Sequence, residues 1–124
     1  RFLFLQRNDP KTKGSWGLVG GRARYTESAF EGLKREIKEE VGGTPKFKKV
    51  IPLELFTSND EKFYFHTYVI AIESEFLPTL NGEHCGYCWT AFESWPKNLH
   101  AGLRNTLNNK SIKGKLQTIL DLIT

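Results

Sequence analysis

The chain has 124 residues, a length that fits one domain of ordinary size. Hydrophobic residues make up 39% of the chain and charged residues 26%, a balance that argues against wholesale disorder. The net charge of +4 is too small to establish nucleic-acid binding, and the basic residues are spread along the chain.

Two short extended segments open the chain. Residues 1–7 contain an apolar run and predict a strand, which ends at the turn sequence Asn8-Asp9-Pro10. Residues 16–19 predict a second, shorter strand, which stops at Gly20-Gly21.

Residues 28–41 predict the first helix. Ser28 and Glu31 have the spacing of a capping box, in which each side chain bonds to the backbone of the other residue. Gly42-Gly43 follows the last apolar position and supplies a C-terminal stop.

The rest of the chain predicts further strands and then two helices. In order, these are strands at 46–56 (interrupted by Pro52), 62–72 and 86–92, and helices at 99–107 and 112–123. There is no internal repeat or linker. We therefore predict a single α/β domain over residues 1–124, layered around one mixed β-sheet.

The first helix places glutamates where they repel one another. At about 100° per residue, Glu36 and Glu40 lie together along one border of the apolar stripe. Such a like-charge pair destabilises a helix by about 0.2–0.5 kcal/mol, and the helix dipole disfavours Glu39 and Glu40 in the last turn. A bound divalent cation would reverse these effects, and Mg²⁺ takes oxygen ligands. The alternative is a solvated acidic face, in which Arg35 pairs with Glu31 and Glu39.

The residues before this helix extend the pattern. Gly20-Gly21 would let the backbone approach an ion or a phosphate closely. From Gly21, five residues lead to Glu27, and seven more lead to Arg35-Glu36-Ile37-Lys38-Glu39-Glu40-Val41-Gly42. This arrangement resembles the Nudix box, the signature of the Nudix hydrolases (MutT-type proteins). Val19 and Gly43 depart from the usual residues, but neither stands at a ligand position.

The resemblance implies an α/β/α sandwich in which the box forms a catalytic loop–helix–loop. It also implies hydrolysis of a nucleoside diphosphate linked to another moiety, with water attacking phosphorus and Mg²⁺, or Mn²⁺ in its place, as the cofactor. By position, the implied metal ligands are Glu36, Glu40, the additional Glu39 and the backbone carbonyl of Gly20. Arg35 and Glu27 would orient the carboxylates. Arg7 and Arg22 flank the box and are candidate phosphate-binding residues, with plain surface residues as the alternative.

The box fixes neither the bond that breaks nor the general base. Glu83 and His84 follow the Asn81-Gly82 turn and are the candidates for that base. His84, followed by x-x-Tyr-x-Trp, resembles a loop of the GDP-mannose mannosyl hydrolases, in which a loop His acts as base for attack at the sugar carbon. That subfamily lacks the last Glu of the box, whereas this chain retains Glu40. Phosphorus attack, assisted by Glu83 or a box glutamate, is therefore the first interpretation.

Cys85 and Cys88 have C-x-x-C spacing but lack the second ligand pair that a zinc site needs, and we interpret them as packing or loop residues. Two cysteines do not make a disulfide scaffold, so a cytoplasmic location is expected. No apolar run is long enough to span a bilayer, which predicts no membrane partner. The chain contains no Met, so we expect residues to be missing before Arg1.

Two other classes of function stay open. A non-catalytic Nudix-fold nucleotide-binding or regulatory module is one, although the intact Arg35, Glu36, Glu39 and Glu40 argue against it. A nucleic-acid binder rests on net charge alone and is disfavoured. The expected partner is a small-molecule nucleotide or nucleotide sugar. A homodimer stays open, because Nudix proteins are often dimers.

Overall fold

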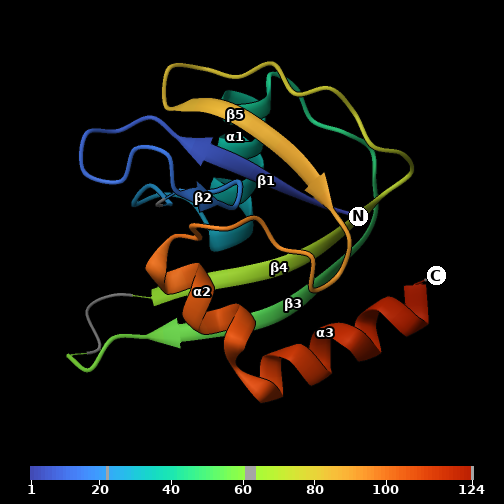
Figure 1. The fold of residues 1–124 in the computed structure, drawn as a ribbon. Helices are drawn as coiled ribbons and strands as arrows, with labels where there is room; N and C mark the ends of the chain where they lie inside the picture. The colour runs from blue at the N-terminus through green and yellow to red at the C-terminus, as the bar shows by residue number, and fades with distance from the viewer. Residues whose placement is uncertain (22, 61–63, 124) are drawn as a thin grey trace. The chain divides into compact units, whose positions relative to one another are not determined.

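The computed structural model describes residues 1–21, 23–60 and 64–123 and has the expected α/β class (Figure 1). The chain divides into two compact units, each built on its own sheet. The first unit contains residues 1–45 and 75–104, and the second contains residues 46–74 and 105–124. The box-like segment and the segment around Glu83 and His84 both belong to the first unit.

The sheet of the first unit has the strand order β2-β1-β5. Its central strand is β1 (Phe2–Arg7), which pairs antiparallel with β2 (Trp16–Gly17) and with β5 (His84–Thr90). Figure 1 shows β5 running alongside β1. Phe4 and Leu5 are the largest fully buried side chains. Because neighbouring side chains on a strand point to opposite faces, both faces of β1 are covered.

A register shift in the pairing of β1 with β5 places the last residue of β1 opposite the first residue of β5. It falls between Gln6 and Arg7, so that Gln6 pairs with Gly86 while Arg7 pairs with His84. The predicted strand at 86–92 thus begins two residues early, and His84 is a strand residue rather than a loop residue. The pairing with β1, which local sequence does not reveal, extends β5 past the Gly86 position.

Helix α1 (Ala29–Val41) begins and ends as predicted. Ser28 is the N-cap, and both hydrogen bonds of the capping box with Glu31 are present. Gly42 closes the helix with a φ of 84°, a left-handed conformation that favours glycine. The last turns bury Ile37, Glu40 and Val41, so one carboxylate of α1 is buried with the apolar stripe.

The second unit contains a two-stranded antiparallel sheet and a helix. The strands are β3 (Phe47–Thr57) and β4 (Tyr64–Ile72), and α3 (Lys110–Ile123) packs on β3. Pro52 does not interrupt β3; instead the register shifts between Pro52 and Glu54. The predicted start of β4 at residues 62 and 63 lies outside the described residues.

Helix α2 (Ala101–Asn108) contains the boundary between the two units. Within both sheets the described strands pair antiparallel, and the one described parallel contact is the isolated bridge between Trp16 and Leu99. Where one mixed sheet was expected, the described strands form two antiparallel sheets, because the hydrophobic pattern predicts strands without specifying their partners. None of the described helices combines the length and apolar character that a membrane crossing needs.

Candidate active site

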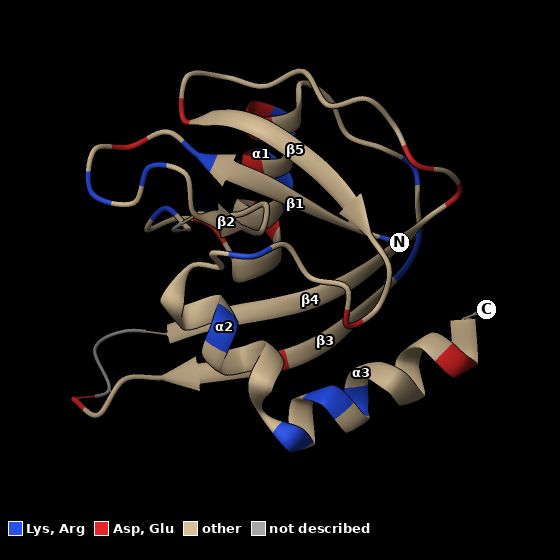
Figure 2. Ribbon diagram, viewed as in Figure 1, with Lys and Arg blue, Asp and Glu red and all other residues tan. Residues whose placement is uncertain are grey.

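Arg35 gathers acidic side chains from α1 and from the loop before it. Its guanidinium donates to Glu27 twice, with Nε–Oε2 and Nη2–Oε1 distances of 2.8 and 3.1 Å. It also donates from Nη1 to Glu36 at 2.8 Å and to Glu39 at 3.3 Å. The hydrogen bonds with Glu27, and to a smaller extent with Glu36, raise the pKa of Arg35. The hydrogen bond from Arg35 lowers the pKa of Glu27. Figure 2 shows acidic and basic residues side by side on α1.

Exposure separates the carboxylates that Arg35 contacts. The side chains of Glu27 and Glu36 are 16% and 15% exposed, whereas that of Glu39 is 48% exposed and also lies 3.9 Å from Arg24. Charge-assisted hydrogen bonds at partly buried positions fix side-chain geometry better than those in solvent. Glu36 is therefore held more firmly than Glu39, whose exposed carboxylate contacts Arg35 and Arg24 over longer distances.

Glu40 is the buried carboxylate of the helix, with 2% exposure. Its Oε2 accepts the backbone N–H of Gly20 at 3.0 Å. Burial raises the pKa of Glu40 to about 8; the bond from Gly20 opposes this rise, and the charges of Glu36 and Glu83 add to it. A buried carboxylate with two negative neighbours is an environment that a cation would stabilise.

The glycine pair before α1 lies directly against these carboxylates. A Cβ added at Gly21 would lie 2.6 Å from Cδ of Glu36. Gly20 has a φ of 153° and presents its N–H to Glu40. The sequence predicted a role for the Gly20 carbonyl, and the contact that the structure adds is made by its amide. The glycine backbone thus approaches the carboxylates closely, while the predicted approach to an ion or a phosphate stays a prediction.

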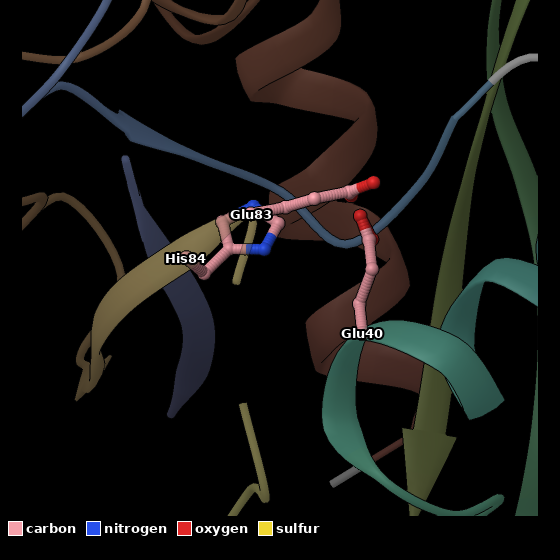
Figure 3. A group of neighbouring side chains, drawn as sticks. All are labelled: Glu40, Glu83 and His84. Carbon is pink, nitrogen blue, oxygen red and sulfur yellow. The ribbon is translucent and has the colours of Figure 1, made fainter. Parts of the chain in front are cut away.

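Glu83 and His84 join Glu40 in a second group. One ligand atom from each of the three residues lies within 4.8 Å of the other two, and Figure 3 shows the two carboxylates and the imidazole converging. Nδ1 of His84 is buried and has no hydrogen-bond partner among the described residues. Burial lowers the pKa of His84, which favours the neutral imidazole. Neutral imidazole can accept a proton or bind a metal.

Of the two predicted phosphate-binding residues, Arg7 and Arg22, the structure describes only Arg7. Arg7 is paired in register with His84 and donates from Nε to Asp9 at 3.0 Å, and its positive charge lowers the pKa of Glu40 and of His84. Arg22 lies outside the described residues. Sequence reasoning named Glu83 and His84 only as candidate bases and missed that they gather with Glu40. It also treated Asn81 as a turn signal, although its side chain bonds to the backbone of Glu39.

The donor set fits a hard or borderline divalent cation. Carboxylate oxygens dominate the group, and an imidazole nitrogen stands beside them. Arg35 compensates Glu27 and Glu36, but the described contacts give Glu40 only the Gly20 amide as a hydrogen-bond partner. A cation bound by Glu40 and Glu83 would supply the missing positive charge.

Comparisons with known proteins agree on one family. A family model described as NUDIX domain matches residues 1–109. The nucleoside triphosphatase NudI of Klebsiella pneumoniae (strain 342) is 26% identical in an alignment 110 positions long, which covers 80% of this chain and 78% of that protein.

Solved structures give the same picture. The MutT protein from Methanosarcina mazei Go1 is 27% identical, with a TM-score of 0.65 over 91% of this chain and 83% of that one. A C. elegans Ap4A hydrolase, in a binary complex, shares the fold with a TM-score of 0.68 at 20% identity, over 96% of this chain and 86% of that one.

Proposed function

The chain belongs to the Nudix family, and we propose that it hydrolyses a nucleoside diphosphate linked to another moiety with the help of a divalent cation. It is a Nudix hydrolase, and we propose that residues 1–124 form one domain of this type. The observation that carries the proposal is the buried Glu40 carboxylate, gathered with Glu83 and His84. Its negative neighbours make a stable site only when positive charge is added.

The proposed ligands come from both groups of acidic residues. Mg²⁺, or Mn²⁺ in its place, would be held by Glu36, Glu40 and Glu83, with Glu39 and the carbonyl of Gly20 as further ligands. When bound, such an ion neutralises the diphosphate, lowers the pKa of an attacking water and stabilises the leaving group. Arg35 and Glu27 keep the carboxylates in place through their hydrogen bonds.

The chain's own residues would then position substrate and accept the proton. Arg7 lies beside His84 at the end of β1, and we propose that Arg7 and Arg22 bind phosphate oxygens. Glu83 is exposed and lies next to Glu40, so its carboxylate can accept the proton of a water that attacks phosphorus. The similarity to the nucleoside triphosphatase NudI favours a nucleoside triphosphate as substrate.

A turnover screen tests this function. The purified chain is incubated with nucleoside triphosphates, nucleotide sugars and dinucleoside polyphosphates, with Mg²⁺ or with EDTA. We expect product release that requires the ion and returns when Mg²⁺ replaces EDTA. Tight nucleotide binding without metal-dependent product from any substrate would contradict the proposal and indicate a binding module.

A second candidate function is favoured by His84, whose imidazole gathers with Glu40 and whose buried Nδ1 has no hydrogen-bond partner among the described residues. Such a nitrogen could act as base for attack at the sugar carbon of a nucleotide sugar. Hydrolysis in ¹⁸O-water separates the two bonds. Carbon attack places ¹⁸O in the free sugar, whereas phosphorus attack places it in a phosphate. Carbon attack together with a large loss in His84→Ala would establish this second function.

Gly21→Ala is expected to lower kcat by about 10- to 100-fold, the range that a misplacement of about 1 Å can cause. The added Cβ would meet the Glu36 carboxyl at 2.6 Å, and Arg35 holds that carboxyl at 2.8 Å, so it moves only by losing this bond. Gly17→Ala is the matched control, because its Cβ would meet nothing within 4 Å. Equal kcat values in the two variants would contradict the proposed role of Glu36.

A further inference from the structure

Asn81 connects the last turn of α1 to the segment that carries Glu83 and His84. Its Nδ2 donates to the carbonyl oxygen of Glu39 at 3.1 Å, and its Oδ1 accepts the N–H of Glu83 at 3.0 Å. Its own carbonyl accepts the N–H of His84 at 3.3 Å. Asn81 thus bonds to the backbone of α1 next to Glu40 and to the backbone of Glu83 and His84.

One of these bonds satisfies a backbone carbonyl in the last turn of α1. The last four carbonyls of a helix have no partner within the helix and must find one elsewhere. The carbonyl of Lys38 accepts the N–H of Gly42, and that of Val41 accepts the N–H of Thr79 at 2.8 Å. The carbonyl of Glu39 is the one that Asn81 satisfies. The segment that leads into β5 is therefore docked on the C-terminal end of α1.

Close packing supports the same docking. A Cβ at Gly42 would lie 2.6 Å from Cβ of Thr79, so the two backbones approach closely. The amide of Asn81 carries a donor and an acceptor, so it serves the Glu39 carbonyl and the Glu83 amide together, which a carboxylate in its place could not do. Asn81 is itself partly buried, and its two side-chain bonds lie at the exposed edge of this contact.

We propose that Asn81 is a positioning residue of the hydrolytic site, which holds Glu83 and His84 against Glu40. This inference rests on the proposed function. Asn81 itself touches neither substrate nor ion. It acts by fixing the spacing between the Glu40 carboxylate on the helix and the side chains of Glu83 and His84, beside the bond between Thr79 and Val41.

Two variants of the full chain test the two side-chain bonds of Asn81. Asn81→Ala removes both side-chain bonds. Asn81→Asp keeps an acceptor for the N–H of Glu83 but cannot donate to the Glu39 carbonyl. We expect kcat to fall by about 10- to 100-fold in both, as for other residues that orient metal ligands. Asn81→Ala should also weaken Mn²⁺ binding, measured by titration calorimetry, by a factor in the same range.

A readout of position separates this role from a general loss of stability. Bound Mn²⁺ broadens NMR signals of nearby groups, so the His84 imidazole resonance should be broadened strongly in the unaltered chain. The signal is assigned by its loss in His84→Ala. We expect weaker broadening in both Asn81 variants at saturating Mn²⁺, because His84 is no longer held beside Glu40.

Asn8→Ala is the matched control. Asn8 donates from its side chain to the carbonyl of Gly82 at 3.3 Å, in the same turn, without bonding to α1 through that side chain. Its kcat and its broadening should stay within twofold of the unaltered chain. If Asn81→Ala or Asn81→Asp behaves like Asn8→Ala, the positioning role is overturned. If the unaltered chain neither binds Mn²⁺ nor turns over any substrate, the proposed function fails instead.

Discussion

Replacing Glu40 with glutamine is expected to lower kcat by at least about 100-fold, since loss of even a residue that orients a metal ligand costs about 10- to 100-fold. Glutamine has the same shape and can still accept the N–H of Gly20, which lies 3.0 Å from Oε2. It lacks the negative charge that a divalent ion needs from this buried position. The fold should persist while the site loses its ion.

The same substitution should stabilise the metal-free protein. Burial and the charges of Glu36 and Glu83 raise the pKa of Glu40 to about 8, so ionised Glu40 is disfavoured in the folded chain. Because the folded pKa lies above that of the unfolded chain, this carboxyl destabilises the fold as the pH rises from about 4.5 toward 8. At pH 8 without metal, we expect Glu40→Gln to increase the free energy of unfolding by about 1 kcal/mol or more.

Turnover and urea denaturation, each with EDTA and with Mg²⁺, measure both effects. In the unaltered chain Mg²⁺ should raise stability, and in Glu40→Gln this gain should be largely lost. Glu73→Gln removes the same charge from an exposed position and should change neither quantity. Near-normal turnover in Glu40→Gln would remove Glu40 from the catalytic site.

Local sequence signals predicted the helix at the centre of this site. Ser28, Glu31 and Gly42 act on their own neighbours in the chain, so their capping roles could be predicted without knowledge of the fold. The helical wheel also placed Glu36 and Glu40 together, and the charge of Glu36 does raise the pKa of Glu40. Periodicity works here because one face of α1 is buried.

Contacts between distant segments were beyond the same reasoning. Glu83 and His84 meet Glu40 because β5 pairs with β1 and because the preceding turn bonds to the end of α1. The local sequence of a strand determines neither its partner strand nor the register of their pairing. The early start of β5 at His84 has the same cause, since pairing with Arg7 outweighs the turn-like sequence around it.

The partners of Arg35 were likewise predicted only in part from the sequence. As the alternative to a metal site, spacing offered partners at Glu31 and Glu39, each four residues away along the helix, and the contact with Glu39 is present at 3.3 Å. Glu31 instead completes the capping box, with its Oε1 3.4 Å from the N–H of Ser28. Arg35 reaches back to Glu27, before the helix, where two parallel hydrogen bonds form. The resemblance to the Nudix box implied that both residues orient the carboxylates, but it did not predict this direct contact between them.

Replacing Arg35 with alanine is expected to lower the free energy of unfolding and to lower kcat by about 10- to 100-fold. The side chains of Arg35, Glu27 and Glu36 are 19%, 16% and 15% exposed, so the two carboxylates would be left without compensation where water reaches them poorly. Glu36 would also lose the contact that fixes its orientation. Both losses arise from one missing side chain.

Two further variants separate the charge of Arg35 from its geometry. Arg35→Lys keeps the charge but cannot form two parallel bonds with Glu27, so we expect part of the stability and little of the kcat to return. Arg24→Ala is the control, because its guanidinium is 66% exposed and 3.9 Å from Glu39, where an ion pair contributes little. Urea denaturation and steady-state turnover measure the series. Full kcat in Arg35→Lys would mean that positive charge alone suffices, and that the fixed orientation of Glu36 plays no part in the reaction.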